Sequence, residues 1–182
     1  MKELKEKIRK FLFERTESKT VTKIFLIDFD GTISNTPEKE EGIKIYKEKT
    51  GNDYPHKGWW GRNESLDMNM FDIKPIQSTV DVVKKHYGQP NTKVFLLTGR
   101  VPKNSQAVEK ILDSYGVKFD DYFYKTSHDT LDFKLKKMSE LLVQYPDTQE
   151  VTLFEDRKEH FDAFEKWGEN NKNIKFKLIK VV

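Results

Sequence analysis

Five short runs rich in β-branched and aromatic residues recur along the chain, and segments with a hydrophobic period near 3.6 residues separate most of them. Such runs predict buried strands, and strands that alternate with helices predict a largely parallel sheet covered on both faces. The sequence therefore predicts the α/β class, with a Rossmann-like three-layer α/β/α arrangement and a mostly parallel sheet of about five strands. The predicted strands span residues 23–28, 93–98, 120–125, 150–154 and 174–181.

Four apolar stripes at helical spacing predict the helices that cover this sheet. Gly116, Pro146 and Gly168 follow the last three stripes and indicate where those helices end. The stripes are Ile76, Val80, Val83 and Tyr87; Val108, Ile111, Leu112 and Tyr115; Leu135, Met138, Leu141, Leu142 and Tyr145; and Phe161, Phe164 and Trp167.

Residues 34–74 break the alternation, because this stretch carries several glycines and prolines and only one charged helical segment, residues 38–49. It follows the first strand, where an insertion would lie above the ends of the sheet, so we expect a small cap that shapes access to a pocket. The adjacent Trp59 and Trp60 could stack on nucleobases or pack against the body of the protein, and we expect core packing for one of them.

Composition limits the function classes. A chain of 182 residues fits one domain, 1–182, with 34–74 as its cap and an amphipathic docking helix at 1–20. Charged residues make up 35% and the net charge is +3, a mild hint of a polyanionic partner. The absence of cysteine excludes disulfides and a cysteine nucleophile, and no apolar run approaches the roughly 20 residues of a membrane span. No signal-peptide core is apparent, so we expect a soluble, cytoplasmic protein.

The first strand ends in two carboxylates, Asp28 and Asp30, and Gly31 and Thr32 follow at once. Side chains two residues apart point the same way along a strand, so both acids can converge on one pocket outside the sheet. Two such groups repel each other unless a hard cation or a shared proton lies between them. The backbone amides and hydroxyl of Gly31 and Thr32 could hold an oxyanion.

Further polar groups follow other predicted strands or begin a helix. Thr98, Gly99 and Arg100 follow the second strand, where Thr98 could bind a phosphoryl oxygen and Arg100 an anionic substrate or an acidic neighbour. Lys134 stands near the start of the third helix, where the helix dipole disfavours a cation, which suggests a task other than helix stability. Glu155 precedes Asp156 and Arg157 at the end of the fourth strand.

The order of these segments resembles the haloacid dehalogenase-like (HAD-like) hydrolase superfamily over about residues 21–180. The resemblance rests on a DxDGT segment, a strand-end threonine, a lysine and an acidic pair, in that order. Shorter motifs resemble the Swiss Army Knife RNA repair-like branch of the superfamily. The loop that begins at Ser34 and the charged helix after it depart from that pattern. The motifs are Asp28 to Thr32, Leu97 to Arg100, Phe133-Lys134, Glu155-Asp156-Arg157 with His160, and Gly58-Trp59-Trp60 with Leu66.

The resemblance implies a phosphatase with catalytic residues Asp28, Asp30, Thr98 and Lys134. Asp28 would be the nucleophile that forms an aspartyl-phosphate, and Asp30 the general acid and base. Mg²⁺ would be the cofactor. Its ligands would be Asp28, Asp30 through its backbone carbonyl, and Asp156. The substrate would contact Gly31, Thr32, Thr98, Gly99, Arg100 and Lys134.

Several alternatives stay open at this stage. Glu155 competes with Asp156 for the metal, and Glu155 could instead orient a metal-bound water or Lys134. His160 is as consistent with a structural hydrogen bond as with a substrate contact. Asp129 and Asp132 are expected to face solvent or to cap the third helix.

The leading prediction is a Mg²⁺-dependent phosphomonoesterase, and the partner is a phosphorylated substrate, an RNA or DNA end or a nucleotide. A small-metabolite phosphatase acting on a sugar phosphate is the rival within the same chemistry. A catalytically silent module that binds nucleic-acid ends is the rival from another class. The sequence predicts no membrane partner and does not determine the oligomeric state.

Overall fold

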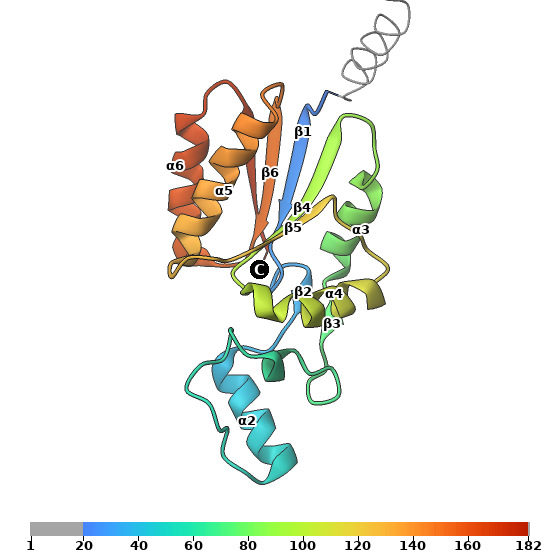
Figure 1. Cartoon of the computed structure of the whole chain (residues 1–182), viewed down its shortest axis with the longest axis vertical. Helices are drawn as coiled ribbons and strands as arrows, with labels where there is room; N and C mark the ends of the chain where they lie inside the picture. The colour runs from blue at the N-terminus through green and yellow to red at the C-terminus, as the bar shows by residue number, and fades with distance from the viewer. Residues whose placement is uncertain (1–19, 182) are drawn as a thin grey trace, which may run out of the picture.

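The computed structural model describes residues 20–181. Its centre is a five-stranded parallel sheet in the order β5-β4-β1-β6-β7 (Figure 1). The three-layer α/β fold with five parallel strands, predicted from the hydrophobic pattern, is confirmed. The docking helix expected within residues 1–20 falls outside the described part of the chain. The strands are β1 (Lys23–Ile27), β4 (Thr92–Thr98), β5 (Asp121–Tyr124), β6 (Glu150–Glu155) and β7 (Lys175–Lys180).

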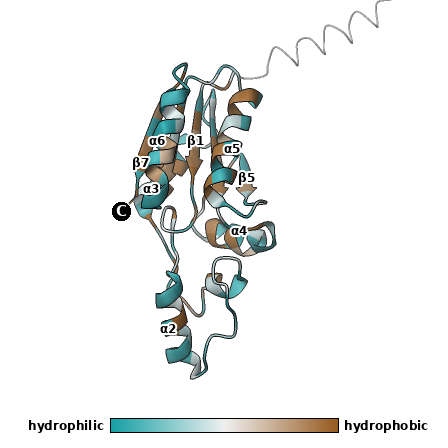
Figure 2. Cartoon of the chain, turned by 90° about the vertical axis from the view of Figure 1, so that its left-hand side faces the viewer, coloured by the Kyte–Doolittle hydropathy of each residue, from teal (hydrophilic) through white to brown (hydrophobic). Residues whose placement is uncertain are grey.

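Helices cover both faces of the sheet. Alternate residues along β1 enter different cores, since Leu26 packs with α5 and α6 whereas Ile27 packs with α3 and α4. Figure 2 shows β1 as a hydrophobic strand between helices that also carry hydrophilic residues. This two-sided burial explains why the central strands are continuous apolar runs. The helices are α3 (Gln77–His86), α4 (Ser105–Ser114), α5 (Thr130–Gln144) and α6 (Phe161–Asn170), and short 3₁₀ helices, η2 (Pro102–Asn104) and η3 (Lys158–His160), precede α4 and α6.

An insert follows β1 and extends beyond the ends of the strands (Figure 1). Its stem is the antiparallel pair of β2 (Ser34–Asn35) and β3 (Lys74–Pro75), and it carries α2 (Lys39–Thr50) and the 3₁₀ helix η1 (Asn63–Leu66). The charged helix expected at 38–49 is therefore present.

Trp59 forms the centre of the insert. Its side chain is 2% exposed, and its indole N–H donates to the Pro37 carbonyl at 3.0 Å. The ring lies so close to Gly42 of α2 that a Cβ at this position would overlap it, so only glycine permits the contact. Of the two tryptophans, Trp59 is thus the one that packs in the core.

Across residues 20–181, the helices are too short or too polar to cross a bilayer.

Candidate active site

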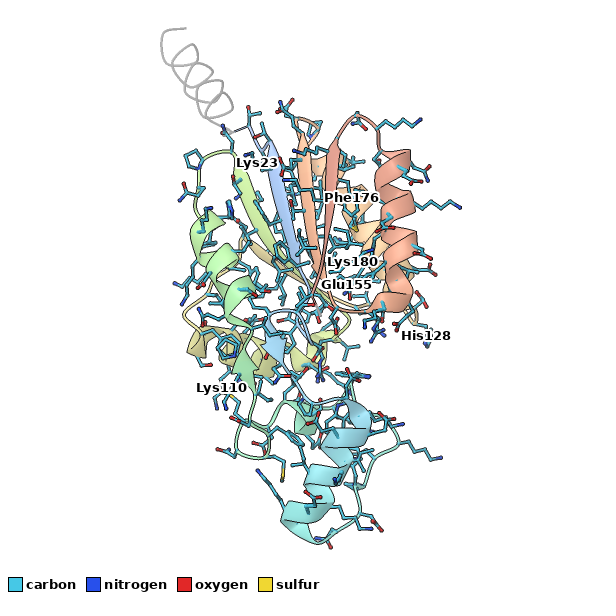
Figure 3. The ribbon with its side chains drawn as sticks, turned by 180° about the vertical axis from the view of Figure 1, so that it is seen from behind. Lys23, Lys110, His128, Glu155, Phe176 and Lys180 are labelled. Atoms are coloured by element: carbon cyan, nitrogen blue, oxygen red, sulfur yellow. The ribbon has the colours of Figure 1, made fainter. Side chains whose placement is uncertain are left out.

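A cavity of about 670 Å³ opens where β1, β4 and β6 end, between the sheet and the insert. Core and insert both contribute to its walls. The lining residues are Asp28, Asp30, Glu38, Trp60, Gly99, Lys125, Thr130, Lys134, Asp156, Arg157, Lys158 and Glu159. Figure 3 shows Glu155 at this same end of the sheet, next to the insert. The strand-end residues that lie far apart in the sequence therefore meet around one hollow, as expected for an open parallel sheet.

Lys134 is the buried cation of this site. Its side chain is 2% exposed, and its Nζ lies 2.6 Å from Glu155 Oε2 and 3.0 Å from Asp28 Oδ1. The contact with Glu155 is a hydrogen bond, whereas the contact with Asp28 is an ion pair, so Asp28 Oδ1 is buried without a hydrogen-bond donor among the described residues. Burial opposes a charge on Lys134, but Asp28 and Glu155 hold its pKa above the ordinary value.

The carboxylates around Lys134 outnumber it. One ligand oxygen from each of Asp28, Glu155 and Asp156 lies within 4.8 Å of the other two. Burial, together with the charges of Glu155 and Asp30 and despite Lys134, raises the pKa of Asp28 to about 7. Burial and the charge of Asp28 likewise raise the pKa of Asp156 to about 6. Three acids facing one ammonium group leave an excess of negative charge.

The same cluster passes a chemical test for a hard divalent cation. The atoms that could coordinate a metal are carboxylate oxygens, which Mg²⁺ prefers. One of them, Asp28 Oδ1, is buried and lacks a hydrogen bond among the described residues. A cation placed among these oxygens would balance the excess charge and lower the pKa values that burial has raised. The residues present therefore fit a magnesium ion.

Asp156 and Glu155 differ in what already occupies their oxygens. Glu155 Oε2 accepts from Lys134 and Oε1 accepts from the backbone N–H of Arg157 at 3.2 Å, whereas Asp156 lines the cavity. The Asp156 carboxylate also lies so close to Gly31 that any Cβ there would overlap it. Gly31 has a φ of +64°, so its turn and this close approach both require glycine. Asp156 therefore presents its carboxylate to the cavity, whereas Glu155 is engaged by Lys134 and the backbone.

Asp30 belongs to a second ion pair. Arg100 donates to both of its oxygens, from Nε at 2.8 Å to Oδ2 and from Nη2 at 2.6 Å to Oδ1. The Thr36 hydroxyl also donates to Oδ1 at 2.7 Å. The Arg100 side chain is fully buried and does not line the cavity. Two roles were considered for Arg100, a contact with the substrate and pairing with an acidic neighbour. The structure shows the pairing with an acidic neighbour, Asp30, and not the position of a substrate contact.

Other predicted phosphate ligands are less accessible than expected. The Thr98 hydroxyl is buried and accepts from the Arg100 backbone N–H at 3.0 Å, and Thr32 is buried as well. The Gly31 N–H donates to the Ser34 carbonyl at 2.9 Å, so this turn uses the amide that was expected to hold an oxyanion. Gly99, in contrast, lines the cavity.

His160 and Asp129, which lie near the motifs, have different surroundings. His160 stacks edge-on against Phe164, and its Nδ1 is buried without a partner in the part of the chain that the structure describes. Burial and nearby Arg157 hold the pKa of His160 below its usual value, so the ring is neutral at pH 7. Asp129 caps α5 by accepting from the Asp132 N–H at 2.8 Å, as predicted.

Sequence reasoning missed several residues of the cavity wall. Lys125 was assigned only to a strand, although its place at the end of that strand was a usable signal. Lys158 and Glu159 lie in η3 beyond the acidic pair. Glu38 comes from the insert, and burial raises its pKa. No sequence signal indicated that Glu38 would face the site, because this depends on where the insert folds back.

Comparisons with known proteins agree with the fold. A chain of the Pnkp1/Rnl/Hen1 RNA repair complex has a TM-score of 0.53 at 16% identity, over 90% of this chain and 44% of that chain. An archaeal β-phosphoglucomutase from the hyperthermophilic Pyrococcus sp. strain ST 04 has a TM-score of 0.51 at 18% identity, over 81% of this chain and 84% of that chain. At these identities the likeness concerns the fold alone.

One curated relative is the uncharacterized protein YMR265C of Saccharomyces cerevisiae, 22% identical over 167 residues. The match covers 79% of this chain and 36% of the yeast protein, so the chain spans about a third of that relative's length. A family model described as HAD domain family 1 in Swiss Army Knife RNA repair proteins matches residues 45–182, a range that begins after Asp28 and Asp30. That range is well over half of the chain, which therefore belongs to this family of HAD-like domains.

Proposed function

We propose that this chain is a Mg²⁺-dependent phosphatase that hydrolyses a phosphomonoester at a nucleic-acid end through an aspartyl-phosphate. The observation that carries the proposal is the group of buried Asp28 and Lys134 with half-buried Asp156 in one cavity, whose wall carries further residues of both charges. Such a group combines a nucleophile, a fixed positive charge and hard oxygen donors. Membership of the HAD-like family supports the same chemistry.

In the first step, an Asp28 carboxylate oxygen attacks phosphorus, and the bond from phosphorus to the ester oxygen breaks. The electron pair of that bond stays on the leaving oxygen, which takes a proton from the Asp30 carboxyl group. The fixed ammonium of Lys134, next to Asp28, stabilises negative charge on the phosphoryl oxygens. Because Glu155 holds Lys134 at 2.6 Å, this charge needs little reorganisation during the reaction.

In the second step, Asp30 takes a proton from a water molecule as its oxygen attacks phosphorus. The Asp28–phosphorus bond breaks, and inorganic phosphate leaves with the Asp28 carboxylate restored. Asp30 thereby returns to its protonated form, so the cycle balances in protons.

The metal ligands of the proposal are the carboxylates of Asp28 and Asp156 and the backbone carbonyl of Asp30. When bound, Mg²⁺ supplies positive charge that offsets the repulsion between the nucleophile and the phosphate. The carboxylate of Asp30 is not among these donors, because Arg100 and Thr36 engage it.

A nucleic-acid end is favoured over a small sugar phosphate by the surroundings of the site. Lys125, Arg157 and Lys158 line the cavity together with one face of the insert, where Trp60 is partly exposed. This pairing of cations with an aromatic ring suits a phosphate backbone and a stacked base. The RNA repair setting of the family is consistent with it.

A second cavity, of about 350 Å³, is lined by a sequence neighbour of a residue of the first. Lys125 lines the first cavity, and the next residue, Thr126, lines the second. Its wall carries three consecutive aromatic residues of the edge strand β5 and two lysines of α5: Tyr122, Phe123, Tyr124, Lys136 and Lys137. A strand with its terminal phosphate in the first cavity could place its neighbouring nucleotides along the second. This supports an oligonucleotide substrate rather than a mononucleotide.

The test is phosphate release, with and without Mg²⁺, from 3′-phosphorylated and 5′-phosphorylated oligonucleotides of increasing length, a nucleoside monophosphate and a sugar phosphate. We expect one oligonucleotide series to be preferred and its kcat/KM to rise with length. Equal rates on all substrates would count against nucleic-acid ends and favour a metabolite phosphatase. Tight binding of oligonucleotides without turnover would instead indicate a silent binding module.

A further inference from the structure

Arg100 is a buried cation whose contacts connect two parts of the molecule. From the end of β4 it pairs with Asp30 beside β1, and its Nη1 donates to two groups of the insert. These acceptors are the Trp60 carbonyl at 2.8 Å and the Ser65 hydroxyl at 2.6 Å. Its guanidinium also lies 5.1 Å from the centre of the Trp60 ring. Ser65 is fully buried in η1, and its hydroxyl, which accepts from Arg100, donates to the Arg62 carbonyl at 2.7 Å.

The hydrogen bonds of Arg100 are almost fully used within the protein. Four of its five N–H groups have acceptors: one at Nε and one at Nη2 with Asp30, and two at Nη1 with the insert. The remaining N–H, on Nη2, belongs to a side chain that is fully buried and does not line the cavity, so Arg100 does not present a donor to a substrate phosphate there. Its function must be exerted through Asp30.

The two oxygens of Asp30 are not equivalent. Oδ1 accepts from Arg100 Nη2 at 2.6 Å, from Arg100 Nε at 3.1 Å and from the Thr36 hydroxyl at 2.7 Å, which uses its lone pairs. Oδ2 accepts only from Arg100 Nε, at 2.8 Å. Oδ2 is therefore the oxygen with capacity for a proton, and the arginine fork fixes where it points.

We propose that Arg100 is a positioning residue that the insert holds through Ser65 and the Trp60 carbonyl, so that Asp30 Oδ2 faces the leaving oxygen of the substrate. The proposal deepens the proposed phosphatase function and rests on it. The insert then has a part in catalysis that needs no contact between Ser65 and the substrate.

The step that depends on this alignment is the proton transfer to the leaving group. As the ester bond breaks, its electron pair moves to the leaving oxygen, and the proton moves from Asp30 Oδ2 to that oxygen. An alkyl ester needs this proton, because an alkoxide is a poor leaving group. p-Nitrophenyl phosphate does not need it, because p-nitrophenolate leaves as an anion near neutral pH. A misaligned Asp30 therefore harms the two esters unequally.

The experiment measures the first step for both esters by rapid-quench kinetics in Ser65→Ala, Arg100→Lys and the unmodified protein. Ser65→Ala removes one of the two insert acceptors of Arg100, together with the hydrogen bond from Ser65 to the Arg62 carbonyl, and leaves the Arg100–Asp30 pair in place. The matched control is Lys57→Ala, an exposed residue of the same insert that does not line the cavity. Unchanged unfolding transitions check that the variants fold, and the Arg100 Nε–H resonance reports the fork without relying on activity.

For the alkyl ester we expect the first step to slow about 10-fold in Ser65→Ala and about 100-fold in Arg100→Lys, at the lower end of what general acid catalysis contributes. The burst of p-nitrophenolate should keep its rate within about threefold, and the substrate Kd from the concentration dependence of the burst should not change. Because Asp30 also activates water, the phosphoenzyme should then accumulate.

Three results would overturn the inference in different ways. Equal losses on both esters with a raised KM would mean that Arg100 binds substrate phosphate, while the phosphatase function would stand. Absence of turnover by the unmodified protein on every ester would overturn the proposed function together with the positioning role. Retention of full activity on the alkyl ester in Ser65→Ala, with an unaltered Arg100 resonance, would show that the insert contact is dispensable.

Discussion

The two buried cations of the site, Lys134 and Arg100, differ in the number of carboxylates that lie close to them. Lys134 is shared by Asp28 and Glu155, with Asp156 close by, so negative charge exceeds positive charge. Arg100 meets the single carboxylate of Asp30, and its other partners are neutral oxygens. An unbalanced cluster attracts a cation and can change its bonding during a reaction. The Arg100–Asp30 pair, in which one positive charge meets one negative charge, is rigid. Such a pair suits a carboxyl group that must be held in a fixed orientation.

The largest effect is expected from removing the nucleophile, Asp28, in the cluster around Lys134. Asp28→Asn should lower phosphate release by at least about 10³-fold, because the amide cannot form the covalent intermediate. Acid quenching after addition of labelled substrate should trap phosphoenzyme in the unmodified protein and none in the variant. Asp132→Asn is the matched control, an exposed aspartate of α5, and it should retain both signals. Metal-dependent turnover by Asp28→Asn would remove Asp28 from its role.

Removing the lysine tests whether the carboxylates really are in excess. Lys134→Met should lower the free energy of unfolding at pH 8, without metal, by about 3–5 kcal/mol, because buried acids lose their only close cation. The pKa values of Asp28, about 7, and Asp156, about 6, lie above their ordinary values. The stability contributed by these raised pKa values is present at low pH and is lost as pH rises through 6 to 7.

The destabilisation by Lys134→Met should therefore shrink when the acids take up protons near pH 5, as urea unfolding at both pH values would measure. Lys136→Met is the control, because Lys136 is exposed and lies two residues after Lys134 in α5. This substitution should have little effect at either pH. A loss that is equally large at pH 5 and pH 8 would contradict the charge excess.

Magnesium should act in the same direction as protons. At ten times its Kd, Mg²⁺ should stabilise the folded protein by about 1.4 kcal/mol and raise Tm by about 3–6 °C, since it binds only the folded cluster. Asp156→Asn should abolish this shift, whereas Asp162→Asn, on α6 and outside the cavity, should retain it. A shift that survives in Asp156→Asn would transfer the ligand role to Glu155.

The smallest effect is expected at the Arg100–Asp30 pair. Thr36→Val removes one hydrogen bond to Asp30 Oδ1 and leaves the Arg100 fork, so it should cost about 1 kcal/mol of unfolding free energy. Denaturant unfolding measures this loss, with Thr50→Val as the control, a threonine whose hydroxyl bonds only backbone groups, the Tyr46 carbonyl and the Asn52 N–H. A loss as large as that of Lys134→Met would mean that the surroundings of Lys134 and of Arg100 do not differ in their balance of charge.

Much of the fold could be predicted because it depends on local pattern. The strand that ends at Ile27 and the helices that carry Val83, Ile111 and Met138 follow from periodicity, and their ends lie within a few residues of the predicted ones. The convergence of Asp28 with Asp156 followed from the general rule that parallel strands end at one edge. These features require no knowledge of which side chains touch.

The partners of Arg100 could not be predicted in this way. From sequence, a guanidinium after a strand end fits a phosphate or a carboxylate equally well, and only burial decides between them. Trp60 and Ser65 contact it from a segment whose folding path has no periodic signal. The same holds for the Gly31 amide, whose use by the turn depends on the position of Ser34.

The sequence by itself determined the layers of the fold, the strand ends at which the acids stand and the family to which the chain belongs, because hydrophobic periodicity and motif order are local properties. Tertiary structure alone decided which acid each cation serves: Lys134 lies among several carboxylates, and Arg100 joins Asp30 to the insert. The physical reason is that ion pairing depends on distance and burial, which arise only when segments remote in the chain pack together.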